Sequence, residues 1–148
     1  MDLISGQKTI KVKMLADIEP PVVMEGSDWV DLRAAETVIM SKGEYKAIRL
    51  GVAMELPEGY EALVIPRSST YKTHHIISAN SVGLIDESYC GNGDEWRFPA
   101  IAMASVHIHK GERICQFRII KHQPRIAFDI VDDLGHADRG GLGSTGTR

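Results

Sequence analysis

The chain has 148 residues, of which 43% are hydrophobic and 25% are charged, and its formal net charge is −3. This length and composition are typical of one ordinary globular domain with enough apolar residues for a core. The slightly acidic balance argues against nucleic acid and membrane surfaces as partners, because both attract proteins with a basic excess. Cys90 and Cys115 lack the spacing of a zinc site, and no apolar segment is long enough to cross a membrane, so we expect a reduced, cytoplasmic protein.

Hydrophobic alternation predicts strands along most of the chain. Residues 10–14 and 48–56 alternate in the way that is typical of half-buried strands. Shorter apolar runs between proline and glycine turn signals predict further strands at 62–65, 100–104, 114–119 and 126–131. Because helical patterns are scarce, we expect an all-β fold, a jelly-roll-like β-sandwich.

A single domain is expected over residues 1–132, followed by a mobile C-terminal arm over 133–148, where the sequence becomes rich in glycine. The one helical turn that the pattern predicts covers residues 70–73, with Ser68 or Ser69 as its cap.

Two early segments carry polar groups next to predicted strands. Asp31 lies among small and apolar residues, where an unpaired charge would be costly unless it is hydrogen-bonded. The segment Pro66-Arg67-Ser68-Ser69 follows a strand, and its guanidinium, hydroxyls and backbone N–H groups suit phosphate oxygens. A capped surface turn is the alternative interpretation of this second segment.

The segment Asn80 to Gly91 reads as a hairpin with polar residues at its end. Gly83 allows a close backbone approach to a flat ligand, Asp86 can accept a proton from water, and Tyr89 can pack against a sugar. The alternative is an aspartate that forms a turn with its own backbone and a tyrosine at the rim.

Two later segments complete the set. The strand after Gly111 carries Gln116, which alternation places on the same face as Ile114. The last ten residues begin at Arg139 and hold glycines, a serine and threonines, so they suit a flap that closes over a polyphosphate. A tail without a ligand is the alternative.

These five segments, in this order and at this spacing, resemble the five motifs of the trimeric deoxyuridine triphosphatases (dUTPases), in particular those of Gram-positive bacteria and prophages. The resemblance implies a jelly roll that assembles as a homotrimer with active sites shared between chains. It also implies Mg²⁺-dependent hydrolysis of dUTP to dUMP and pyrophosphate, which limits uracil in DNA and supplies dUMP for thymidylate synthesis.

The resemblance further implies a role for each matched residue. Asp86 would be the general base, and Tyr89 would lie beneath the deoxyribose. The uracil would be read by the hairpin residues Asn80, Gly83, Leu84 and Ile85. The phosphates would be held by Arg67, Ser68, Ser69, Gln116 and Arg139. Leu142, Gly143, Ser144 and Thr145 of the last motif would also bind the substrate. Mg²⁺ would have no direct protein ligand, and Asp31 would act on it only indirectly.

The chain departs from the family pattern where the last motif commonly has an aromatic residue that stacks on uracil. Leu142 stands there instead, which gives up stacking worth ~1–3 kcal/mol. Trp96, Arg97 or Phe98 could cover the base in its place, the arginine by planar stacking. Core packing is the alternative for Trp96 and Phe98.

Two other functions fit parts of the sequence. A dCTP deaminase would share the fold and the trimer, although the hairpin with Asp86 and Tyr89 matches the hydrolase pattern. A regulatory protein partner could bind the Trp96 segment or the stretch at His74 and His75. His107 and His109 lie on one strand face without a third metal ligand, so we interpret them as surface residues.

Overall fold

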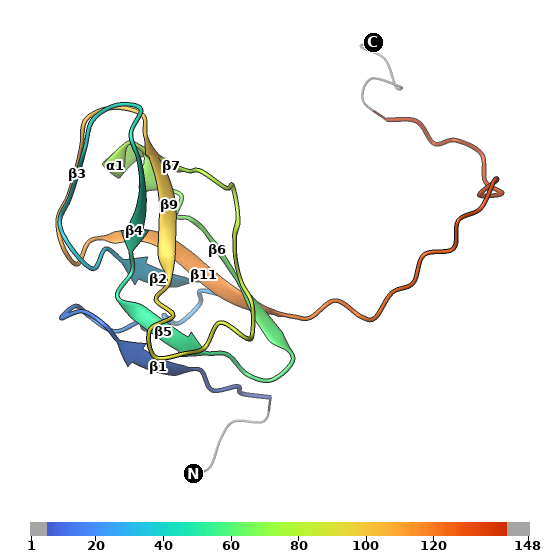
Figure 1. Cartoon of the computed structure of the whole chain (residues 1–148), viewed down its shortest axis with the longest axis horizontal. Helices are drawn as coiled ribbons and strands as arrows, with labels where there is room; N and C mark the ends of the chain where they lie inside the picture. The colour runs from blue at the N-terminus through green and yellow to red at the C-terminus, as the bar shows by residue number, and fades with distance from the viewer. Residues whose placement is uncertain (1–5, 142–148) are drawn as a thin grey trace.

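A computed structural model describes residues 6–141, and nearly all of their regular structure is β (Figure 1). The strands are β1 (Lys11–Met14), β2 (Val30–Arg33), β3 (Val38–Met40), β4 (Tyr45–Arg49), β5 (Val52–Glu55), β6 (Tyr60–Pro66), β7 (Ile76–Ser78), β8 (Gly83–Ile85), β9 (Arg97–Ala102), β10 (Val106–Ile108) and β11 (Arg113–Lys121). The short helix α1 covers Thr70–His74, close to the predicted helical turn. Among these residues no helix is both long enough and apolar enough to span a membrane.

The strands form antiparallel sheets in which neighbours in space are mostly distant in sequence. The largest sheet has the order β2-β11-β6-β8, and a three-stranded sheet has the order β4-β9-β7. Two further pairs join β1 to β5 and β10 to β3. The nine-residue strand β11 pairs with both β2 and β6, so it brings the ends of these strands together.

The core lies between the sheets and is almost entirely apolar. Its largest side chains with no more than 2% exposure include Trp96, Phe98, Leu32, Ile48 and Leu50. The Trp96 ring meets the Phe117 ring edge-on, with 5.2 Å between centroids and 81° between planes. Edge-to-face packing of this kind adds to the stabilisation that aromatic burial provides.

The prediction of one half-buried strand over residues 48–56 is wrong. The chain bends at Gly51, which has φ +69°, and divides into β4 and β5. Because of this bend β4 can pair with β9 while β5 pairs with β1. Three consecutive residues of β5 are buried, so β5 is covered on both faces.

Gly51→Ala should lower the free energy of unfolding by about 2–4 kcal/mol, because an added Cβ combines an unfavourable backbone conformation with overpacking. A Cβ at Gly51 would lie 3.0 Å from both Ala16 Cβ and Ile18 Cδ1. Gly43→Ala is the matched control, since Gly43 has φ +90° but open space around it. Urea unfolding should give a smaller loss for the control, and equal losses would contradict the packing argument.

The strand predicted at residues 126–131 is also wrong. The last strand ends at Lys121, and every residue from 123 to 141 is exposed. Figure 1 shows this segment, coloured orange to red, leading away from the sheets. It presents the apolar side chains of Ile126, Phe128, Ile130, Val131 and Leu134 to solvent. The apolar run is present in the sequence, but the described residues provide no strand for it to pair with. The division at residue 132 stays a prediction.

Candidate active site

The ends of β2, β6 and β11 form a cluster of charged side chains. Arg67 Nε donates a 2.9 Å hydrogen bond to Asp31 Oδ1, and Arg113 Nη1 lies 3.8 Å from Asp31 Oδ2. The carboxylate of Asp31 is therefore paired, as its apolar sequence surroundings required. The Arg67 and Asp31 side chains are both partly exposed, so the cluster is accessible to a ligand.

Helix α1 shapes the turn after Arg67, but not through the predicted serine cap. Ser69 is the N-cap residue, yet it makes no side-chain capping hydrogen bond. Instead, the buried Thr70 accepts a 2.7 Å hydrogen bond from the Arg67 N–H and donates one of 2.8 Å to the Ile114 carbonyl. The turn is thus fixed to β11 by Thr70, and the Ser69 hydroxyl is not used as a cap.

Gln116 belongs to the same cluster, because its position in β11 lies opposite Asp31 on β2 and Ile65 on β6. Its Nε2 donates a 3.1 Å hydrogen bond to the Pro66 carbonyl. The strict alternation predicted for this strand fails at its start, where a register shift lies between Arg113 and Cys115. Such a bulge explains why consecutive residues of β11 are fully buried there.

The hairpin predicted over Asn80 to Gly91 is wrong. This stretch, the β8 segment (residues 80–91), contains the single strand β8, which pairs with β6 so that Leu84 lies opposite Leu63 and Gly83 opposite Val64. A Cβ at Gly83 would lie 3.3 Å from Val64 Cβ, so the close approach that Gly83 permits is to β6. Asn80 is exposed at the start of the β8 segment, and its Oδ1 accepts a 2.9 Å hydrogen bond from Ser78.

Asp86 follows β8 directly and is exposed. Its Oδ2 accepts hydrogen bonds from the Ser88 hydroxyl and from the Ser88 N–H, the latter at 2.9 Å. These bonds, first the side-chain bond and then the backbone bond, lower the pKa of Asp86 below its ordinary value. The predicted aspartate turn is therefore present, and it keeps the carboxylate ionised.

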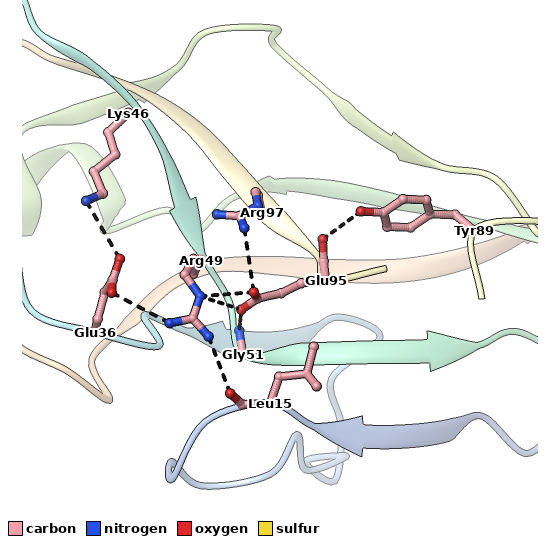
Figure 2. A network of polar contacts seen from close by, with 8 residues as sticks. All are labelled: Leu15, Glu36, Lys46, Arg49, Gly51, Tyr89, Glu95 and Arg97. Atoms are coloured by element: carbon pink, nitrogen blue, oxygen red, sulfur yellow. Dashed lines mark hydrogen bonds and ion pairs between the residues drawn. The ribbon is translucent and has the colours of Figure 1, made fainter. Parts of the chain in front are cut away.

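Asp86 lies at a pocket of about 280 Å³ that the β8 segment forms with residues 95–97 at the start of β9. The pocket is lined by Leu84, Ile85, Asp86, Tyr89, Glu95, Trp96 and Arg97. The Tyr89 hydroxyl donates a 2.9 Å hydrogen bond to the Glu95 carbonyl (Figure 2). The fold thus brings an ionised carboxylate and an anchored aromatic ring to one small cavity.

Two of the three residues considered as a lid are core residues. Trp96 is 0% and Phe98 1% exposed, which confirms the core-packing alternative for both. The Arg97 side chain is 48% exposed and lines the pocket, so of the three it alone presents an exposed side chain to a ligand.

The surfaces suggested for a regulatory partner are partly buried as well. Trp96 is inside the core, and His74 is buried with its Nε2 3.1 Å from the Arg113 carbonyl. His107 and His109 are exposed with ring centroids 4.4 Å apart, as expected of surface residues.

The structure does not bring all the predicted residues to one place within the chain. Arg67, Ser68, Ser69 and Gln116 are absent from the lining of the pocket at Asp86. Arg139 lies in the exposed segment after β11, where its Nη1 donates to the Gly140 carbonyl. Leu142, Gly143, Ser144 and Thr145 lie outside the described residues.

Sequence reasoning missed three residues that shape these two places, namely Thr70, Arg49 and Glu95. Thr70 holds the Arg67 turn, and Glu95 accepts hydrogen bonds from Arg49 beside the pocket. One indication of this ion pair was present in the sequence, namely Arg49, a charged residue within the alternating run at 48–56.

Comparison with known proteins shows the family. A profile of the dUTPase family matches residues 21–147. The chain is 57% identical over 140 residues to the SPbeta prophage-derived deoxyuridine 5'-triphosphate nucleotidohydrolase YosS of Bacillus subtilis (strain 168), a match that covers 94% of this chain and 99% of that relative. The chain belongs to the dUTPase family, which confirms the predicted resemblance and enzyme class.

Solved structures confirm the fold. A dUTPase mutant of Staphylococcus bacteriophage 80alpha with dUpNHpp has a TM-score of 0.76 at 23% identity, covering 95% of this chain and 100% of that chain. A dUTPase mutant from phage phi11 of S. aureus, described with a structural Mg(II) ion, has a TM-score of 0.73 at 20% identity and covers 87% of this chain and 100% of that one. The all-β class and the dUTPase type of fold are therefore as predicted.

Proposed function

We propose that this chain hydrolyses dUTP to dUMP and pyrophosphate, and thereby limits uracil in DNA and supplies dUMP for thymidylate synthesis. The observation that carries the proposal is the pocket shared by Asp86, whose pKa the bonds to Ser88 lower, and the anchored ring of Tyr89. Membership of the dUTPase family supports the same substrate. The two unpaired cysteines, Cys90 and Cys115, fit the expected cytoplasmic location.

The β8 segment supplies the selectivity in this proposal. The main chain of Gly83, Leu84 and Ile85, together with Asn80, binds the polar edge of uracil, and a narrow site along β8 excludes purines and the thymine methyl group by size. Tyr89 lies beneath the deoxyribose, where its ring leaves a 2′-hydroxyl crowded and without a hydrogen-bond partner. Arg97 covers the base by planar stacking, in place of the aromatic residue of other family members.

Asp86 acts as the general base. Its carboxylate takes a proton from a water molecule, which attacks the α-phosphorus in line and expels pyrophosphate. Arg67, Ser68, Ser69 and Gln116 hold the phosphates of the substrate, and Arg139 from the C-terminal arm adds a second guanidinium to the developing charge. Leu142, Gly143, Ser144 and Thr145 are proposed to close over the phosphates with it.

Mg²⁺ fits this arrangement as an ion carried by the triphosphate. The Asp31 oxygens face the guanidinium groups of Arg67 and Arg113, and Asp86 Oδ2 is bonded to Ser88. Within residues 6–141 no group of three or more His, Cys, Asp or Glu side chains is arranged to hold a metal. Asp31 then acts only indirectly, by placing Arg67. When bound, Mg²⁺ neutralises charge on the phosphates.

The proposed assembly is a homotrimer with shared sites. The charged cluster at Arg67 and the pocket at Asp86 are separate places on one chain, and Arg139 lies on a segment that leaves the domain. A site that needs all three groups is completed if one chain provides the phosphate cluster, a second the β8 segment and a third the arm.

Pyrophosphate release from dUTP in the presence of Mg²⁺ tests this function, and UTP, dCTP and dTTP are assayed separately as alternative substrates. We expect rapid cleavage of dUTP and slow or no cleavage of the others. Ammonia release from dCTP would instead establish a deaminase. If the folded protein acts on none of the four nucleotides, the result would favour the alternative function, binding of a regulatory protein. A pull-down would detect such a partner.

Ser88→Ala should move the acid limb of the pH profile of kcat/KM for dUTP to higher pH. Asp86 works as a base only when ionised, and the Ser88 hydroxyl lowers its pKa, so loss of this donor raises the pKa toward the ordinary value. The control is Ser105→Ala, an exposed serine in the loop between β9 and β10. An acid limb that stays in place in Ser88→Ala would mean that another group sets it.

A further inference from the structure

A largely buried ion pair lies directly beside the pocket (Figure 2). Glu95 is only 9% exposed, and its carboxylate accepts hydrogen bonds of 2.9 and 3.1 Å from Arg49 Nε. A third bond of 2.9 Å comes from the Gly51 N–H at the bend between β4 and β5. The negative charge is thus fully compensated, as a carboxylate away from water requires.

Arg49 is itself held on two further sides. Its Nη2 donates a 3.3 Å hydrogen bond to the Leu15 carbonyl, and its Nη1 lies 3.6 Å from Glu36 Oε2. The hydrogen bond to Glu95 raises the pKa of Arg49 further above its ordinary value, so the guanidinium stays charged. Arg49 therefore provides a fixed point for the Glu95 carboxylate.

The main chain next to Glu95 is joined to the same bend. The Trp96 N–H donates to the Val52 carbonyl at 2.9 Å, and the Leu50 N–H donates to the Trp96 carbonyl at 3.0 Å. Side-chain and main-chain bonds together fix the segment 95–97 against β4 and β5. This segment forms one wall of the pocket.

Two pocket residues contact Glu95. The Tyr89 hydroxyl donates to the Glu95 carbonyl at 2.9 Å, and Arg97 Nη2 lies 3.7 Å from Glu95 Oε1. Both side chains line the pocket from opposite ends of the loop 89–97. Figure 2 shows Arg49 and Arg97 at the Glu95 carboxylate and the Tyr89 hydroxyl at the main-chain carbonyl of the same residue.

We propose that Glu95, fixed by Arg49, is a positioning residue that sets the place of the Tyr89 ring and so determines discrimination between deoxyribose and ribose. The inference rests on the proposed hydrolysis of dUTP. A ring that excludes a hydroxyl by crowding must be held closely, since a misplacement of about 1 Å can change a rate by about 100-fold. Without its carboxylate anchor the Glu95 main chain shifts, and the Tyr89 ring gives way to a 2′-hydroxyl.

The test compares kcat/KM for dUTP and for UTP in the wild type and in Glu95→Gln, Tyr89→Phe and the double variant. Tyr89→Phe keeps the ring and removes only its bond to Glu95. We expect the ratio of dUTP to UTP to fall about tenfold in each single variant. We expect no further fall in the double variant, because both changes act on one contact. Glu36→Gln, which removes an exposed partner of Arg49, should leave the ratio unchanged.

Tyrosine ring signals in the NMR spectrum of the ligand-free protein provide a measurement independent of turnover. Tyr89→Phe identifies the Tyr89 signal among the four tyrosines. That signal should move in Glu95→Gln while the signals of Tyr45 and Tyr71 stay in place. If Glu95→Gln does not fold, Arg49→Lys takes its place, since it keeps the charge but loses the guanidinium geometry.

The outcomes separate the two proposals. An unchanged dUTP to UTP ratio together with an unmoved Tyr89 signal overturns the role of Glu95, even if the melting temperature falls. A wild type that does not cleave dUTP overturns the proposed function, while a moved Tyr89 signal in Glu95→Gln would still support positioning of the ring.

Discussion

Asp86→Asn should lower kcat for dUTP by about 10³-fold and leave KM close to the wild-type value. Asparagine has the size of aspartate but cannot take a proton from the attacking water. Asp86 is exposed, and within residues 6–141 its carboxylate is hydrogen-bonded only to Ser88, so the domain should remain folded. Steady-state pyrophosphate release, combined with a melting curve for each protein, measures both effects.

The matched control is Glu87→Gln, which neutralises the neighbouring carboxylate. Glu87 accepts a 3.1 Å hydrogen bond from the Gly59 N–H and lies 3.4 Å from His122 Nε2, and it does not line the pocket. Its kcat should remain within about threefold of wild type, since such an exposed pair contributes little. Retention of more than a tenth of the activity by Asp86→Asn would place the base elsewhere.

Trp96→Ala should lower the free energy of unfolding by about 3–5 kcal/mol, the range for removal of a buried aromatic side chain. Trp96 is 0% exposed and packs edge-on against Phe117. Arg97→Ala should leave stability nearly unchanged and raise KM for dUTP about tenfold, because it removes the proposed cover of the base. Urea unfolding and steady-state kinetics on both variants distinguish a core residue from a cover.

Each variant serves as the control for the other, because the two residues are adjacent in the chain and both line the pocket. If Trp96→Ala were fully stable but bound dUTP weakly, Trp96 would be the cover and its buried position would not describe the working enzyme. If Arg97→Ala left KM unchanged, stacking by this guanidinium would be excluded.

The predicted strands that the structure contains are those whose partners lie within the domain. The alternating run at 10–14 and the short apolar runs at 62–65 and 114–119 became β1, β6 and β11, because each has a complementary strand beside it. The run at 48–56 alternates like the run at 10–14, but alternation is identical in a straight strand and in one that bends. Only the positive φ of Gly51 decides between them, and a lone glycine does not reveal its φ.

The order of the motifs predicted most residues of the candidate site, but it did not predict which residues contact one another. The paired carboxylate of Asp31 followed from its apolar surroundings, but its partner Arg67 is 36 residues away. Arg49 and Glu95 are 46 residues apart, and neither belongs to a recognised motif. Partners of this kind are set by strand pairing between distant segments, so local pattern cannot indicate them.

The segment after β11 is exposed throughout as far as residue 141, so the domain can be folded while its active site is incomplete. A fully extended chain gains ~3.3–3.6 Å per residue, so residues 123–141 can reach roughly 60 Å from the sheets that bury the core. Under the proposed assembly Arg139 therefore acts on a neighbour. Dilution should then reduce turnover per chain, through loss of neighbours, at concentrations where each domain is still folded.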